Sequence, residues 1–487
     1  MRPAARLSGL AAAATLALSA WLTTATPALG TQTGPDWVAS DNVKFIQQLP
    51  DAADGVGGKV IGNYLYMSSS KDLRIYDISD PPHPVLVSQL TLAVEWENEM
   101  LPTNGRLLGL SSSTAVPFVG PPGCEMASAA DQASHPDQNC LAIYDVTDKA
   151  NPRLLSTVFG AGDHTSTCIL DCTYFWGSKG SVTDARDPAH ARLICNWQDA
   201  SNHLPGQAAH NVTEVTPGYI LTSTQPVMLV SVLAKDGGSV CHPKLFATGA
   251  NADGRFIHSN TWPLGGTDKF ALIGGETNFR PQCGVLGQVP AADLGDDAAF
   301  MTWDTTQVYK DGHYVLGSKF HMIDQVRMRN GTYFDGSPPA NTAGCSVHWF
   351  EQHPSFNGGG LVAVAAYDNG VRFMQVDATG HIKEVGFFRG AQSWASAPHW
   401  APDGKTVYVI DYTRGIDVLQ WNGPTYVPGV ATASAAGSGG STTFSAPAPA
   451  APNTSRRSPA PAPLPLLPGV AAVAGAVLLR RRAKGRT

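Results

Sequence analysis

Histidine and acidic side chains stand at matching places in seven successive segments of this chain, and they are its best candidates for chemistry. In the first four segments the residue lies eight positions before a turn residue, as Asp54 lies before Gly62. In the last three segments the neighbouring residues, rather than the count, define the place. The seven residues are Asp54, Glu97, His164, His210, His258, His348 and His399.

Imidazole nitrogens and carboxylate oxygens are donor atoms that zinc, copper and iron accept in proteins. The chain has only 14 histidines in 487 residues, so chance poorly explains five of them at matching places. A divalent ion would also offset the charge of the two acids. The pattern predicts a metal site that holds Cu, Fe or Zn, with the histidines as ligands and the acids as further ligands or as a base.

A strand-turn-strand repeat must position these residues. Residues 73–90 read LRIYDISDPPHPVLVSQL, residues 141–158 read LAIYDVTDKANPRLLSTV, and residues 182–195 carry a worn third copy. In each copy an apolar run ends in Asp, a second Asp follows three residues later, and Pro comes soon after. Asp bonds turn backbone and Pro fixes φ, so each copy predicts two strands joined by a tight turn. Because a strand pair is not stable alone, its repetition predicts an array.

The array predicts an all-β fold, a seven-bladed β-propeller over residues 40–425. Its last strand set, residues 406–421, lacks a closing strand, whereas residues 43–49 look like a closing strand without a blade. Pairing the two would shut the ring and leave no exposed sheet edge. Insertions at 112–138 and 276–298 blur the count, so six or eight blades remain alternatives. Long helical periodicity is absent, which disfavours an α/β fold.

Two resemblances to known families add to this interpretation. The segments 73–90 and 141–158 resemble LVIVD repeats, found in exported bacterial proteins expected to form β-propellers. That resemblance implies a fold far more than an activity. The histidine ring resembles the His-lined channel of nitrous-oxide reductase and, less closely, that of the copper-dependent methanethiol oxidase or selenium-binding family. It implies copper and nothing about substrate, because the broader patterns of those families are missing and two ring positions are acids. A metal at this place would support oxidative chemistry, as in an oxidoreductase, or hydrolytic chemistry.

A structural role for the histidines stays open beside the metal site. A buried histidine can be satisfied by backbone or by a neighbouring hydroxyl. Thr165, Ser259 and Ser346 lie close enough in sequence to serve. The protein would then be a non-catalytic binding or scaffold propeller at the cell surface. Its long insertions would recognise cell-wall material or a partner protein. A third alternative is a channel mouth that binds an organic ligand.

Both ends of the chain indicate export and membrane attachment. Residues 1–30 have a positive start, an Ala/Leu-rich core and small residues at the end, as a signal peptide does. Residues 429–463 are rich in Ala, Ser and Pro and predict a disordered spacer. Residues 464–479 are apolar and predict a transmembrane anchor, and residues 480–487 form a basic cytoplasmic tail. We expect a monomer on the outer face of the bacterial cytoplasmic membrane.

Eight cysteines in an exported chain predict disulfides, because no paired C-x-x-C motif is present. Cys124 with Cys140 is the pairing best supported by spacing. Neighbouring strands suggest two further pairs, and four-residue spacing suggests the last. These candidates are Cys195 with Cys241, Cys283 with Cys345, and Cys168 with Cys172.

Several function classes lack their sequence marks. The net charge of −6 provides no basic footprint for nucleic acid. No nucleophile elbow, Walker loop or Rossmann fingerprint occurs. The HisGluxxHis motif of standard zinc proteases is also missing. The histidine ring therefore remains the principal candidate for function.

Overall fold

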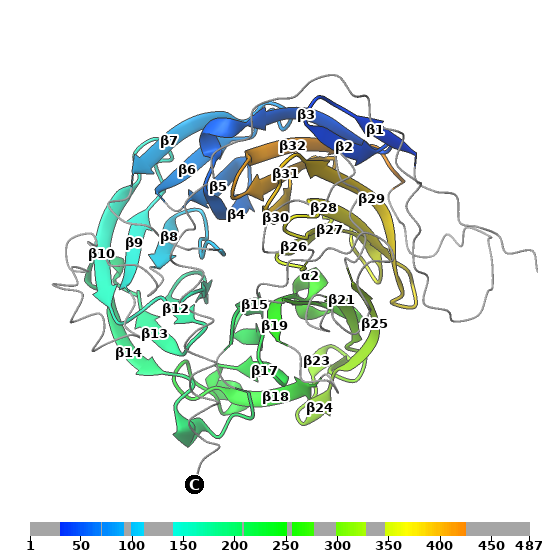
Figure 1. Ribbon diagram of the computed structural model, residues 1–487. Coiled ribbons are helices and arrows are strands. Elements are labelled where there is room, and N and C mark those ends of the chain that lie inside the picture. Colours follow the sequence, from blue (N-terminus) through cyan, green and yellow to red (C-terminus); the bar gives the residue numbers. More distant parts are fainter. Residues whose placement is uncertain are drawn as a thin grey trace, which may run out of the picture.

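Seven of the eight β-sheets among the described residues are arranged as blades around a central axis in the computed structural model, so the protein is a seven-bladed β-propeller (Figure 1). The structure describes residues 30–69, 71–91, 99–111, 140–206, 209–250, 256–276, 299–327 and 346–424. The signal peptide, spacer and anchor predictions fall almost wholly outside these residues. Among the residues described, no helix is long and apolar enough to span a membrane.

Each blade is an antiparallel sheet whose first strand lies nearest the axis. Blade 1 consists of β4 (Gly55–Ile61), β5 (Tyr64–Ser69), β6 (Asp72–Asp77) and β7 (Val85–Thr91). Blade 2 consists of β8 (Leu107–Ser111), β9 (Cys140–Asp145) and β10 (Arg153–Phe159). Blade 3 consists of β11 (Ser166–Ile169), β12 (Tyr174–Gly177), β13 (Ser181–Asp184) and β14 (Arg192–Asn196). An isolated bridge between Thr103 and Leu108 adds inner backbone to blade 2.

Blades 4 to 7 follow the same order. Blade 4 consists of β15 (Val212–Thr216), β16 (Tyr219–Thr222), β17 (Val227–Ser231) and β18 (Lys244–Gly249), and blade 5 of β19 (Ile257–Thr261), β20 (Phe270–Gly275), β21 (Ala299–Asp304) and β25 (His321–Arg327). Blade 6 consists of β26 (Phe350–Gln352), β27 (Gly360–Ala365), β28 (Val371–Val376) and β29 (Ile382–Gly390). Blade 7 consists of β30 (Ala395–Trp400), β31 (Thr406–Asp411), β32 (Gly415–Trp421) and β3 (Val43–Leu49). Short additions are β22 (Tyr309–Lys310), β23 (His313–Tyr314), β24 (Ser318–Lys319), which joins β18, and the one-turn helix α2 (Pro263–Gly266).

The predicted strand-turn-strand repeat is confirmed in all three copies, as the pairs β6–β7, β9–β10 and β13–β14. The Asp that ends each first strand accepts a hydrogen bond from the backbone N–H two residues later. The distances are 2.8 Å from Asp77 to Ser79, 3.0 Å from Asp145 to Thr147 and 3.1 Å from Asp184 to Arg186. These Asx turns explain why Asp recurs at this place.

The predicted closure of the ring is also confirmed, because β3 from the N-terminal region pairs with β32 along its length. In Figure 1 the blue β3 lies against the orange β32. The sequence did not predict that β1 (Thr31–Thr33) and β2 (Trp37–Ser40) would extend blade 6 by pairing with β29. The N-terminal segment therefore covers the edges of two blades, which protects them from pairing with other chains.

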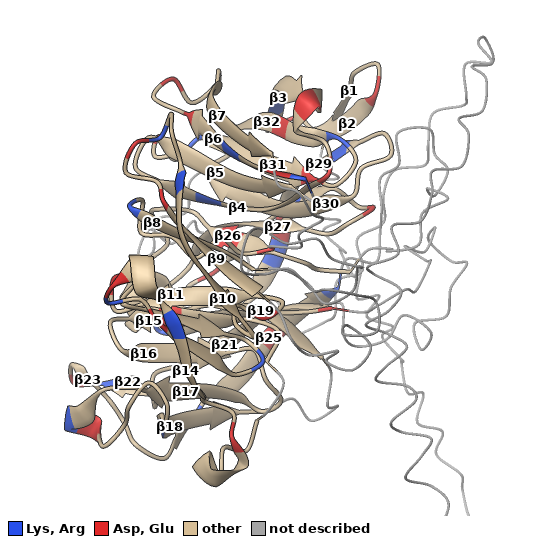
Figure 2. Cartoon of the chain, turned by 90° about the vertical axis from the view of Figure 1, so that its left-hand side faces the viewer, with Lys and Arg blue, Asp and Glu red and all other residues tan. Residues whose placement is uncertain are grey.

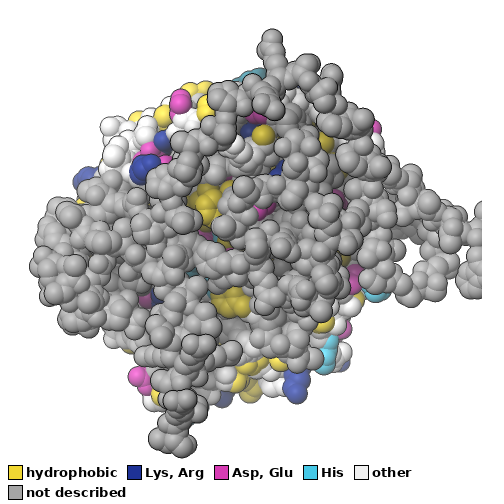
Figure 3. Space-filling model, in the orientation of Figure 1, with side chains coloured by type: hydrophobic (Ala, Val, Ile, Leu, Met, Phe, Trp, Pro, Cys, Tyr) yellow, Lys and Arg dark blue, Asp and Glu magenta, His cyan; other side chains and the backbone are white. Residues whose placement is uncertain are grey.

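Apolar side chains between neighbouring blades form the core. One cluster joins blades 6 and 7 and contains Phe373, Trp400 and Trp421, with the rings of Phe373 and Trp421 stacked at 4.8 Å. Acidic and basic residues are dispersed over the blades (Figure 2). Side chains of several classes are visible along the rim of the face in Figure 3. Packing between blades fixes the rigid frame from which the inner strands present their side chains.

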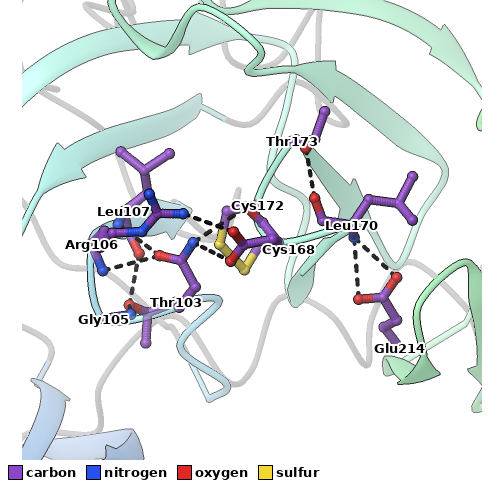
Figure 4. Close-up of a disulfide and its surroundings, with 11 residues drawn as sticks. Thr103, Gly105, Arg106, Leu107, Cys168, Leu170, Cys172, Thr173 and Glu214 are labelled. Carbon is purple, nitrogen blue, oxygen red and sulfur yellow. Dashed lines mark hydrogen bonds and ion pairs between the residues drawn. A yellow bond between two sulfur atoms is a disulfide. The ribbon is translucent and has the colours of Figure 1, made fainter.

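Two predicted disulfides are confirmed, Cys168–Cys172 and Cys195–Cys241. Figure 4 shows the first between Arg106 of blade 2 and Glu214 of blade 4, whose carboxylate accepts from the N–H of Leu170 at 3.0 Å. Cys140 is disulfide-bonded as well. Its expected partner, Cys124, and the pair Cys283 and Cys345 lie outside the described residues.

Replacing both Cys195 and Cys241 by Ser should lower the free energy of unfolding by about 2–4 kcal/mol, because their disulfide closes a loop with a sequence separation of 46. The matched double variant at Cys168 and Cys172, with a separation of 4, should lose about 2 kcal/mol less on loop-length grounds. Urea unfolding of the two variants beside wild type checks this order, and equal losses would contradict it.

Candidate metal centre

Four of the predicted histidines surround one buried carboxylate, that of Glu99. Each imidazole directs its Nε2 atom toward a Glu99 oxygen. The distances are 3.5 Å for His164, 3.6 Å for His210, 3.3 Å for His258 and 3.3 Å for His348. The Nε2 atoms of His164 and His210 also lie 3.0 Å apart. Five donor groups from far-separated parts of the chain therefore meet at one point.

The inner strands of consecutive blades position these groups. His164 and His210 each precede an inner strand, β11 and β15, by two residues, and His348 precedes β26 by two. His258 is the second residue of β19, and Glu99 precedes the bridge that opens blade 2. These inner strands lie around the open middle of the ring in Figure 1. One position per blade, repeated around the axis, brings the side chains together.

The hydroxyl groups considered as partners for the imidazoles bond backbone instead. Thr165 Oγ1 donates to the carbonyl of His210, and Ser259 Oγ donates to the carbonyl of His348 at 2.8 Å. The Oγ of Ser346 donates to the carbonyl of Val347 at 2.9 Å. The first two bonds run between adjacent blades, so they fix the backbone that carries each ring.

His348 has a defined tautomer that directs a lone pair into the centre. Its Nδ1 lies 2.9 Å from the backbone carbonyl of Ser396, and a carbonyl only accepts, so Nδ1 carries the proton. In the neutral ring, Nε2 then points a lone pair at a carboxylate oxygen 3.3 Å away. That Nε2 atom is buried and has no hydrogen-bond partner, and the same holds for both nitrogens of His258. Lone pair and carboxylate repel unless a cation, either a proton or a metal ion, lies between them.

Burial and the charges of neighbouring side chains together set the pKa values in the cluster. Burial favours the neutral form of Glu99, yet the nearby His348, His164 and His210 hold its pKa well below the usual range. Burial and the neighbouring His258 lower the pKa of His210 well below its ordinary value. For His348, burial acts to lower the pKa, but Glu99 prevails and raises it. The cluster thus combines an ionised carboxylate with a neutral imidazole, both forms that bind metals.

The spacing of the donor atoms matches the edges of a metal coordination polyhedron. Zinc binds imidazole nitrogen at about 2.0–2.1 Å, so adjacent ligands of a tetrahedral site lie about 3.4 Å apart. The observed separations run from 3.0 to 3.6 Å. Hydrogen bonds between imidazole and carboxylate are shorter, at about 2.7–2.9 Å. The spacing is therefore compatible with a shared ion, while the contact between His164 and His210 is also within hydrogen-bond distance.

Groups around the donors have the contacts expected of metal ligands. Trp349 Nε1 donates to Glu99 Oε2 at 3.2 Å, and the indole ring packs against His258 with centroids 5.2 Å apart. Ligating histidines commonly donate their second ring N–H to a backbone carbonyl, as His348 does to Ser396. Both contacts fix the orientation of a donor, and the contact of His348 leaves its inward Nε2 atom unused.

A second carboxylate, Glu276, lies at the same centre. Its Oε2 is 3.9 Å from His258 Nε2, and its Oε1 accepts a hydrogen bond from the hydroxyl of Tyr367 at 2.7 Å. Glu276, His258 and His348 form one group whose ligand atoms lie within 4.8 Å of one another, and Glu99, His210 and His258 form another. Burial and Glu276 raise the pKa of Tyr367 well above the usual value, so this phenol remains a donor.

Sequence reasoning missed both carboxylates. Glu95, Glu97 and Glu99 alternate in the sequence, and counting back eight residues from Gly105 reached Glu97, which lies outside the described residues. A two-residue shift in the same acidic run would have reached Glu99. Glu276 directly follows β20, at the start of an insertion, and no repeat pattern marks it.

The structure places Asp54 and His399 with other partners. Asp54 pairs with Lys71, and His399 Nδ1 lies 2.7 Å from Glu351 Oε2. The reason is the strand register. In blade 5 the ladder skips His258 as a bulge residue, and the corresponding bulges are Val56 in blade 1 and Ser396 in blade 7. The equivalents of His258 in those blades are therefore neither Asp54, which was chosen by count, nor His399, which was chosen from its neighbouring residues.

If the centre binds Zn²⁺, its affinity for the ion should fall when the pH is lowered from about 8 to about 6. Glu99 raises the pKa of His348, so protons compete with the ion for this ring more strongly at the lower pH. Each displaced proton costs about tenfold in affinity per pH unit below the pKa. Chelator competition with Zn²⁺ at the two pH values measures the effect, and a pH-independent affinity would contradict it.

Comparison with known proteins supports the fold and the repeat. Residues 56–91, which form most of blade 1, match the LVIVD repeat family. Among solved structures, the β-propeller domain of Myceliophteria thermophila Cps50 (Swd1) is similar, with a TM-score of 0.50 and 10% identity, over 78% of this chain and 99% of that one. At that identity the likeness concerns the fold alone. No curated protein matches this chain. The chain is thus a seven-bladed propeller with an LVIVD repeat in its first blade.

Proposed function

We propose that this protein is a metal-binding propeller that holds a divalent transition-metal ion on its axis through Glu99, His164, His210, His258 and His348. One observation carries the proposal: four imidazole Nε2 atoms converge within 3.6 Å of a single buried carboxylate. The buried Nε2 atoms of His258 and His348 have no hydrogen-bond partner. Imidazole-rich sites suit zinc, copper and iron, so the ion belongs to this group.

The residues around the donors define what chemistry the centre can support. Copper or iron would supply electron transfer and hence oxidoreductase chemistry, whereas zinc would supply Lewis acidity. Glu99 neutralises part of the charge of the ion, and Trp349 holds Glu99 in place. Tyr367 stands next to the ring of His348, with centroids 4.5 Å apart, and presents its hydroxyl to Glu276. This pair would accept or hold a proton beside a bound substrate.

The proposal includes export and attachment to the outer face of the membrane. The signal-like residues 1–30, the spacer and the apolar and basic C-terminal segments support it. The disulfides Cys168–Cys172 and Cys195–Cys241 support it too, because such bonds persist in oxidising compartments. Protease treatment of intact cells should degrade the propeller, and complete protection would contradict this placement.

Metal content tests the central proposal. Protein purified without chelator, or loaded with Zn²⁺, Cu²⁺ or Fe²⁺ and then dialysed, should retain at least one ion per chain. His258→Ala should retain less, and His399→Ala, whose ring pairs with Glu351 outside the cluster, should behave as wild type. Wild-type protein that takes up none of the three metals would overturn the proposal.

A scaffold propeller with structural histidines is the competing function. It has one observation in its favour, the ion pair that a protonated His348 would form with Glu99 at 3.3 Å. In that case His258→Ala lowers the thermal stability without changing metal content. The insertions that would recognise a partner, 112–138 and 276–298, lie outside the described residues apart from Glu276.

A further inference from the structure

We infer that the centre holds two metal ions, bridged by the carboxylate of Glu99, rather than one. The inference rests on the proposed metal-binding function and deepens it. Six buried or nearly buried donor groups meet here: Glu99, Glu276, His164, His210, His258 and His348. A tetrahedral ion uses four ligands, so the donor set exceeds what one such ion requires.

The donors can be assigned to two sets of three, and His258 also forms a group with Glu99 and His210 that connects the sets. His164 and His210 have Nε2 atoms 3.0 Å apart and both face Glu99. His258 and His348 each lie 3.3 Å from Glu99, and with the second acid, Glu276, they also form a group whose donor atoms all lie within 4.8 Å of one another. Each set thus offers two imidazoles and a carboxylate, a combination that catalytic metal sites use while leaving a position open.

Glu99 is placed to bridge the two sets. Its Oε2 lies 3.6 Å from His210 and 3.3 Å from His258, which belong to different sets. Its Oε1 likewise lies 3.5 Å from His164 and 3.3 Å from His348. Each oxygen of one carboxylate therefore faces both sets. Metal pairs in hydrolases and related enzymes lie about 3.5–4 Å apart, a spacing that a bridging carboxylate spans.

Glu276 has the supporting contact expected of a ligand in the second set. Tyr367 donates to its Oε1 at 2.7 Å, while Oε2 turns toward His258 at 3.9 Å. Both Glu276 and Tyr367 are buried, and in a buried site a single carboxylate needs a cation nearby. Two divalent ions against two carboxylates leave a net charge of about +2. The pair of ions would therefore bind hydroxide or a small anionic substrate between them.

Copper stoichiometry combined with electron paramagnetic resonance tests the inference. Wild-type protein titrated with Cu²⁺ should bind two ions per chain, with a signal weakened by coupling between them. Glu276→Gln should bind one ion and show the full signal of an isolated Cu²⁺. Glu351→Gln, which alters the acid paired with His399 outside the centre, should keep two coupled ions. Circular dichroism confirms that each variant is folded.

The outcomes separate this inference from the proposed function. One ion per chain in wild type, unchanged in Glu276→Gln, would overturn the two-ion centre and leave the metal-binding function standing. No bound ion in wild type would overturn both. Tyr367→Phe provides a further check, since loss of the contact to Glu276 should weaken the second ion by about 10–100-fold and leave the first unchanged. Equal weakening of both ions would contradict the assignment of Glu276 to one set.

Discussion

Glu99→Gln should weaken Zn²⁺ binding by more than about 100-fold, because mutation of a mere supporting contact already costs 10–100-fold. Glu99 is the one group that all four histidines face, at 3.3 to 3.6 Å. Glutamine keeps the size of the side chain and its contact with Trp349 but removes the negative charge. It also replaces one acceptor oxygen by an NH₂ group, which cannot bind a metal ion.

The control for this change is Glu351→Gln, which alters a partly exposed acid that contacts a histidine, His399, at 2.7 Å. It should leave the Zn²⁺ dissociation constant unchanged within about twofold, because it lies outside the donor set. Chelator competition gives both constants under the same conditions. If the Glu99 variant bound Zn²⁺ as tightly as wild type, the carboxylate at the centre would not be a ligand.

Arg414→Met should lower the free energy of unfolding by about 3–5 kcal/mol, the cost of breaking a buried ion pair from one side. Arg414 is nearly fully buried and binds Asp417 of β32 through two hydrogen bonds of 2.9 Å. A third contact, of 3.2 Å, reaches Asp36 in the segment before β2. The side chain therefore ties the N-terminal segment to the blade that closes the ring, and its loss removes three charged contacts at once.

The loss should depend on pH in a defined direction. Burial raises the pKa of Asp417 to about 6, although Arg414 acts to lower it. Without Arg414 the pKa of Asp417 rises further. At about pH 5 the buried carboxyl is then protonated and neutral. At about pH 8 the unfolded chain ionises this carboxyl freely, so keeping it buried costs folding free energy in either form. The deficit of Arg414→Met should thus be smaller at the lower pH. Urea unfolding at both values measures it.

Arg186→Met is the matched control for that experiment. Arg186 pairs with Asp184 at 2.5 Å, yet its own side chain is 63% exposed. Asp184 is buried, with 8% of its side chain exposed, but the exposed guanidinium lets solvent screen the pair. A screened pair contributes about 0–1 kcal/mol, so this variant should unfold almost as wild type does. Equal losses for the two arginine variants would show that burial of Arg414 does not determine the effect.

The blades could be predicted because their signals are local. Asp77 and Asp145 end strands with turns that the backbone geometry requires, and the same turn recurs with the same spacing. Closure by β3 followed from a count that left one strand without a blade and one blade without a strand. The addition of β1 and β2 to blade 6 had no such signal, since short edge strands carry little pattern of their own.

The candidate site was predicted in its histidines and missed in its acids. A count along the chain reached His164 and His210, and neighbouring residues in the sequence marked His258 and His348. His399 was wrongly predicted to lie in the cluster, because a bulge at Ser396 shifts the register of β30. No residue pattern in the sequence indicates this bulge. Glu276 follows a strand end, where the packing of other blades rather than local sequence decides which way a side chain points.

The most direct test of the metal centre is an anomalous-diffraction map from crystals of protein loaded with Zn²⁺. A zinc peak should lie about 2.0–2.2 Å from Nε2 of two or more of the four histidines and from a Glu99 oxygen. A map without a peak among these residues, or with zinc bound only elsewhere on the molecule, would contradict the account.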